Sequence, residues 1–151
     1  MPDPWLTEVL PPLWEVEKYA CKILRGRSGV LCGYVGVPTD NPAYGFPYYC
    51  GEYPIEQILA FPAMVISEAK IQSQINAVQV HGGLTFSGGK KDIPDLSLPW
   101  HWFGFDCAHD GDYCPNYDYT YFPKGIYRDL DYVKKEVEGL LLQLQSIRRE
   151  P

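Results

Sequence analysis

The aromatic run WHWFGFDCAH at residues 100–109 constrains the fold more than any other stretch of the chain. Successive side chains of a β-strand point to opposite faces, and this run places large aromatic rings at both odd and even positions. A strand of that kind must be covered on both faces. We therefore predict a central strand here, followed by a polar turn that begins near Asp106 and His109.

Further strands are expected on both sides of this run in sequence. They are predicted in the second half of 14–26, at 30–38, and on both sides of the glycine pair within 77–89. Residues 55–76 predict a helix that Pro62 breaks or kinks.

The C-terminal segment has the clearest periodicity. Asp129 near its start and Arg148 and Arg149 near its end match the helix dipole. Its apolar residues recur at alternating spacings of four and three, as on one face of an amphipathic helix: Ile126, Leu130, Val133, Val137, Leu140, Leu144 and Ile147.

The 151 residues suit one domain, 1–151, with one core. The expected fold class is α+β, with a mainly antiparallel sheet packed by the long C-terminal helix. Four prolines in residues 1–13 predict an irregular N-terminal arm.

Charge and composition exclude several function classes. A net charge of −6 disfavours broad nucleic-acid binding. No apolar run is long enough to cross a membrane, and the start lacks the basic region of a secretory signal, so a cytoplasmic location is expected. The five cysteines are an odd number without a CxxC pair, which favours neither a disulfide framework nor a zinc knuckle.

Ionisable side chains gather where two predicted strands end. His81 closes one strand, Asp106 and His109 close the other, and Asp112 follows. If the two strands are neighbours, these side chains converge. Four interpretations stay open: the four residues contact a ligand, they bind a divalent metal, Asp106 orients His109 for acid–base catalysis, or the groups only cap the turns.

Other motifs narrow the chemistry. Gly82 and Gly83 expose N–H groups that suit an anion, but no P-loop, GxGxxG or GxSxG pattern is present. Cys107 lies among aromatic residues and is expected to be a buried hydrophobe, not a nucleophile. His101 is expected to be a partly buried structural residue. Three basic pairs are candidates for contact with a phosphate, although most are expected to be surface charges: Arg25 with Arg27, Lys90 with Lys91, and Lys124 with Arg128.

Four blocks of sequence carry a resemblance that spans roughly residues 20–145. They are LCGYVGVP with NPAYG, VHGGLTFSG, WFGFDCAHDGD and YRDLDYVKKEVEGL. In this order they resemble the blocks of a widespread, uncharacterised family of small bacterial and phage proteins. The resemblance implies that the second and third blocks form one site, with these positions carried over: His81, Gly82, Gly83, Asp106, His109, Gly111 and Asp112. It also marks 48–76 as a probable insertion and helical element, which would be a lid, an oligomer interface or a partner-binding element.

The leading functional hypothesis is a small ligand-binding protein. Twelve tyrosines and four tryptophans favour an aromatic pocket beside the polar residues, with Tyr44 and Trp102 among the residues that contact the ligand. Aromatic faces would stack a base while cationic and backbone groups hold phosphates. The phage side of the resemblance implies a counter-defence protein that sequesters a nucleotide-type signal.

Two alternatives stay open. One is a hydrolase, metal-dependent or using His109 and Asp106 as an acid–base pair, for a small phosphorylated or amide substrate. The other is an acidic inhibitor that binds a protein. The kinked apolar helix also predicts a homo-oligomer.

Overall fold

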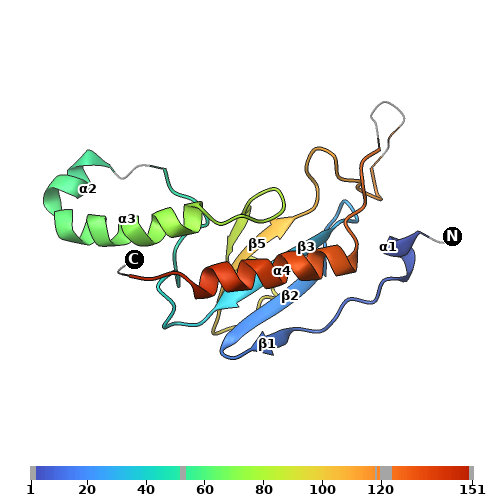
Figure 1. The fold of residues 1–151 in the computed structure, drawn as a ribbon, viewed down its shortest axis with the longest axis horizontal. Coiled ribbons are helices and arrows are strands. Elements are labelled where there is room, and N and C mark those ends of the chain that lie inside the picture. Colours follow the sequence, from blue (N-terminus) through green and yellow to red (C-terminus); the bar gives the residue numbers. More distant parts are fainter. Residues whose placement is uncertain (1–2, 52–53, 118, 120–123, 150–151) are drawn as a thin grey trace.

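The computed structural model describes residues 3–51, 54–117, 119 and 124–149. Its sheet has the strand order β1-β2-β3-β5-β4, and every pairing is antiparallel (Figure 1). The strands are β1 (Trp14–Val16), β2 (Tyr19–Arg25), β3 (Leu31–Val37), β4 (Phe86–Gly88) and β5 (His101–Asp106). Together with the helices, this sheet confirms the predicted α+β class.

The aromatic run forms β5, which pairs with β3 on one side and β4 on the other. Phe103 and Phe105 belong to the main core cluster, whereas Trp102 belongs to a second cluster with Tyr34 and Leu96. Both faces of β5 are therefore covered, as the alternation of large side chains predicts.

Helix α4 (Leu130–Gln145) packs against β2 and β3 (Figure 1). Its apolar side chains from Val133 to Leu144 are buried. The helix begins later than its apolar periodicity predicts. Asp129 caps it by accepting a hydrogen bond from the backbone N–H of Tyr132. Ile126 lies before this cap in an extended segment and is exposed.

The predicted strand at 77–81 is wrong. No strand forms there, and only Phe86–Gly88, after the glycine pair, joins the sheet. The backbone of this segment bonds to side chains of α4 instead of to another strand: the N–H groups of Gln79 and His81 donate to Gln143 and Glu136. Backbone groups satisfied in this way need no sheet partner.

Residues 55–76 form two helices, α2 (Ile55–Ala60) and α3 (Pro62–Asn76), and the break falls at Pro62 as predicted. Pro62 occupies the first turn of α3, where its missing N–H costs nothing. None of the described helices is both long and apolar enough to span a membrane.

The N-terminal arm contains a short helix, α1 (Pro4–Thr7), and Glu8 attaches it to the domain. The Glu8 carboxylate accepts hydrogen bonds from Arg25, from the hydroxyl of Tyr127 and from the backbone N–H of Leu130 at the start of α4. Glu8 thus satisfies one of the free N–H groups of that helix.

Candidate functional site

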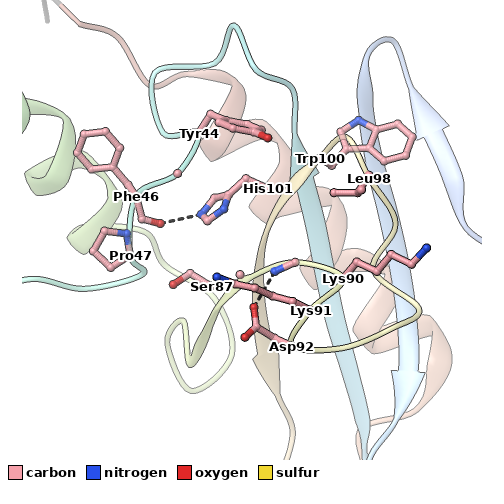
Figure 2. A pocket seen from close by; sticks show the side chains of 13 residues that line it. Tyr44, Phe46, Pro47, Ser87, Lys90, Lys91, Asp92, Leu98, Trp100 and His101 are labelled. Atoms are coloured by element: carbon pink, nitrogen blue, oxygen red, sulfur yellow. Dashed lines mark hydrogen bonds between the residues drawn. The ribbon is translucent and has the colours of Figure 1, made fainter.

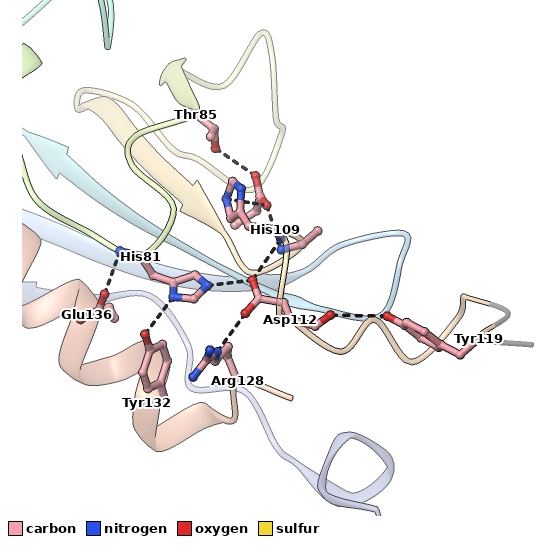
Figure 3. Close-up of polar contacts among 10 residues, drawn as sticks. His81, Thr85, His109, Asp112, Tyr119, Arg128, Tyr132 and Glu136 are labelled. Atoms are coloured by element: carbon pink, nitrogen blue, oxygen red, sulfur yellow. Dashed lines mark hydrogen bonds and ion pairs between the residues drawn. The ribbon is translucent and has the colours of Figure 1, made fainter. Parts of the chain in front are cut away.

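The polar residues predicted from the strand ends do meet, at the C-terminal end of β5 (Figure 3). His81 lies between two partners: its Nε2 is 2.7 Å from Asp112 Oδ2, and its Nδ1 is 2.8 Å from the hydroxyl of Tyr132. An ionised carboxylate only accepts, so Nε2 carries the hydrogen, and in the neutral ring Nδ1 accepts from Tyr132. Both ring nitrogens of His81 are therefore engaged.

Asp112 is the centre of this network, and its side chain is 1% exposed. Besides His81, its carboxylate accepts from Arg128 Nε at 2.9 Å and from the backbone N–H of His109 at 3.0 Å. Burial by itself would raise the pKa of Asp112, but these hydrogen bonds outweigh it and hold the pKa below the ordinary value of 3.8. Asp112 therefore stays ionised, and its oxygens are occupied.

Asp106 and His109 form a second pair beside the first. Asp106 accepts from the Thr85 hydroxyl at 3.0 Å and from the N–H of Ala108. Its Oδ1 lies 3.3 Å from His109 Nε2, but the direction does not suit a hydrogen bond, and Nε2 is buried without one. This nitrogen is the one unsatisfied buried side-chain atom among the described residues.

Gly82 explains how close the two histidines lie. A Cβ at Gly82 would stand 2.1 Å from the His109 ring, and the φ of Gly82 is +68°. The ring of His109 thus packs directly on the glycine backbone, with its centre 5.9 Å from that of His81. Gly83 also has a positive φ, but a Cβ there would meet nothing within 4 Å.

The four-residue metal set is not assembled. Within the part of the chain that the structure describes, no three His, Cys, Asp or Glu side chains are placed to hold a metal ion. The donors lie in two separate pairs, and Asp112 is already neutralised by the guanidinium of Arg128. A cation would have to displace that charge.

Arg128, Tyr132 and Glu136 all contact His81 or Asp112. Tyr132 and Glu136 were not among the predicted site residues, and Arg128 was expected only as one of several possible phosphate contacts. The three recur at a spacing of four residues, with Arg128 just before α4 and the other two on the helix. That spacing was visible in the sequence, but nothing in it indicated that the 77–81 segment would lie along this side.

A pocket of about 840 Å³ opens at the other end of β5 (Figure 2). Its wall comes from the loop after β3, the loop after β4 and the residues that lead into β5. The lining residues are Tyr44, Gly45, Phe46, Pro47, Ser87, Gly88, Gly89, Lys90, Lys91, Asp92, Leu98, Trp100 and His101.

His101 is partly buried in this wall, and its Nε2 donates to the Phe46 carbonyl at 2.7 Å. Burial lowers the pKa of His101, so the ring is neutral at pH 7. Its ring lies 5.7 Å from that of Tyr44. These contacts fit the predicted structural role of His101, but its place in the pocket was not predicted.

Two predicted features of the pocket need correction. Trp102 cannot contact a ligand because it is fully buried, with its indole N–H donated to the Ser97 carbonyl. Trp100 lines the pocket instead, together with the predicted Tyr44. The pocket also does not adjoin the polar residues, because the six residues of β5 separate them by roughly 17 Å.

Cys32 of β3 and Cys107, directly after β5, behave as buried hydrophobes. Burial raises the pKa of Cys32 to about 11 and raises that of Cys107 further still. All five cysteines are free. A thiol held in this state is neither a nucleophile nor a metal ligand at neutral pH.

Comparison with protein-family models, with curated proteins and with solved structures finds no match to this chain. The resemblance to a phage and bacterial family therefore stays a prediction.

Proposed function

We propose that this protein binds a small anionic ligand with a flat ring system, such as a nucleotide, in the pocket at the start of β5. The observation that carries the proposal is the lining: aromatic rings from Tyr44, Phe46 and Trp100 share one pocket with Lys90 and Lys91. Ligand pockets commonly measure 300–1,000 Å³ and combine apolar walls with a few polar groups. This pocket has the size for a nucleotide.

The local charge favours an anion although the whole chain is acidic. The lining contains two lysines, Lys90 and Lys91, and one carboxylate, Asp92, while the His101 ring is neutral. Asp92 is turned onto the backbone, where it accepts from the N–H of Gly89 at 3.0 Å (Figure 2). A phosphate would pair with the lysines, and a base would stack on an aromatic face.

The biological role that goes with this chemistry is sequestration of a nucleotide-type signal, in a phage or mobile-element setting. That part of the proposal is supported by the four-block resemblance alone. The pocket combines aromatic and cationic groups, which suit the binding of a flat anion.

The test is isothermal titration calorimetry with adenosine, AMP and ATP. We expect affinity to rise with the number of phosphates and to fall as salt is added, because the lysines supply the attraction. Lys91→Ala should weaken ATP binding about tenfold, the effect of losing roughly 1.4 kcal/mol from a charged contact. Lys135→Ala, which removes an exposed lysine from α4, is the matched control and should change nothing. Absence of binding, or equal binding by the Lys91→Ala variant, contradicts the proposal.

Acid–base catalysis at His109 is a second candidate, favoured by one observation. His109 is about one-third exposed, stands beside the Asp106 carboxylate and has an unsatisfied Nε2. The test is release of phosphate from a panel of phosphomonoesters at pH 7. Turnover that disappears in His109→Gln, with the fold intact by circular dichroism, supports the second candidate. Lys91→Ala should leave that turnover unchanged if the two sites are separate.

A further inference from the structure

Helices α2 and α3 extend beyond the end of the sheet (Figure 1), and only the C-terminal part of α3 is attached to the core. Ile71 and Ile75 are buried there, and Gln74 exchanges two hydrogen bonds with the backbone of Arg148. The remainder, from Ile55 to Ile66, has Val65 as its one buried residue among those described.

This outer part carries a set of exposed apolar side chains, which we call the apolar tip. Each is between 55% and 75% exposed, and the members are Ile55, Leu59, Phe61, Met64 and Ile66. At about 200 Å² for a large side chain, they expose roughly 600 Å² in total. Single exposed leucines need no explanation, but five within twelve residues do.

We propose that the apolar tip is the interface through which two copies of this chain form a dimer. The first argument is area. Two tips buried against each other remove at most about 1,200 Å² from water. Stable specific interfaces bury about 1,200–2,000 Å², so the exposed area of the tip reaches the lower end of what a two-fold dimer needs.

The second argument is charge. The whole chain carries a net charge of −6, so two copies repel one another over most of their surface. Residues 54–77 contain only three charged residues, Glu56, Glu68 and Lys70, with a net charge of −1. The tip is thus a part of the surface where two acidic copies meet with little electrostatic repulsion.

A membrane surface fits the tip less well. Helices that lie on membranes carry lysines and arginines on their polar side to meet anionic lipids. Lys70 is the only basic residue of 54–77. A second copy of the chain supplies a matching apolar surface without that requirement, because both partners of a two-fold contact use the same patch.

The experiment is sedimentation velocity and multi-angle light scattering over a concentration series up to about 100 μM, well above the dissociation constant of a standard interface. Wild-type protein should show twice the mass of the 17.2 kDa chain. Leu59→Glu and Met64→Glu should each give the monomer. Leu142→Glu is the matched control, since it places the same charge at an equally exposed leucine on α4, and it should stay dimeric.

Hydrogen exchange gives a second readout that needs no variant. Amides of residues 55–66 should become protected as the protein concentration rises, and the rest of the chain should not. A wild-type monomer at every concentration overturns the proposal. So does a dimer that survives both tip substitutions, or concentration-dependent protection elsewhere in the chain. Binding of a monomeric wild-type protein to phosphatidylserine vesicles would instead assign the apolar tip to a membrane surface.

Discussion

Gly82 offers the sharpest test of how the polar residues are packed, because Gly83 beside it provides a matched control. Both have φ in the left-handed region, +68° and +79°, so an alanine at either position pays the same backbone cost of about 1–2 kcal/mol. They differ in what a new Cβ would meet. At Gly82 it would stand 2.1 Å from the ring of His109, and at Gly83 it would meet nothing within 4 Å.

Relieving the clash at Gly82 requires the His109 ring to move from its position. Overpacking of this kind costs a further amount of about 1–3 kcal/mol. We therefore expect Gly83→Ala to lower the free energy of unfolding by about 1–2 kcal/mol and Gly82→Ala by about 2–5 kcal/mol. Urea unfolding followed by tryptophan fluorescence measures both, with unchanged slopes as the check that the compared states are the same.

The double variant Gly82→Ala with His109→Ala separates the two costs. Without the ring, the Gly82→Ala penalty should fall to that of Gly83→Ala, so the two substitutions should not be additive. Equal penalties for Gly82→Ala and Gly83→Ala in the otherwise unchanged protein would refute the reasoning, because the contact with His109 would then carry no energy.

Three more predictions concern the core and the termini. Because the pKa of Asp112 is lower in the folded protein than its ordinary value of 3.8, the ionised carboxylate stabilises the fold above that pH. This stabilisation disappears as the pH falls through the native pKa. Unfolding monitored between pH 5 and 2 should therefore show a loss of stability below about pH 4, and the loss should be smaller in Asp112→Asn. Glu8→Gln should lower the free energy of unfolding by about 2 kcal/mol, because it removes the charge of a carboxylate that accepts hydrogen bonds from three donors. The control Glu15→Gln, at an exposed residue of β1, should have little effect in the same urea titration. Trp102→Ala should cost about 3–5 kcal/mol in the free energy of unfolding. Calorimetry under conditions where the variant is folded should give an unchanged ligand affinity, because the Trp102 side chain is buried outside the pocket lining.

The sequence predicted best those elements whose side-chain pattern has a single structural explanation. Aromatic residues at both odd and even positions required a two-sided strand at β5, and the apolar stripe from Leu130 to Leu144 required a helix with one buried face. Both inferences depend on local spacing, which the chain displays directly. The convergence of His81 with Asp112 was predicted from two neighbouring strands, and it occurs although no strand ends at His81.

The errors arose where one segment is completed by another that is distant in sequence. Residues 77–81 alternate like a strand, yet side chains of α4 take their backbone groups. Trp102 was predicted to contact the ligand, yet Leu96 and the chain before β5 cover it. The guanidinium that pairs with Asp112 comes from Arg128, which lies 16 residues away before a helix. Nothing in local spacing distinguishes these outcomes from the ones predicted.

The two sites at the ends of β5 are joined by a single stretch of chain, residues 81–92. His81 fixes its beginning to Asp112 and Tyr132, the Thr85 N–H bonds to the carbonyl of Gly104, and β4 then leads into the loop with Lys90 and Lys91. A polar cluster whose hydrogen bonds are nearly all satisfied is suited to hold such a stretch in place. His81→Ala should therefore speed hydrogen exchange at Thr85 and lower ligand affinity from a distance, whereas unchanged exchange at Thr85 would show that β4 holds its register without the polar cluster.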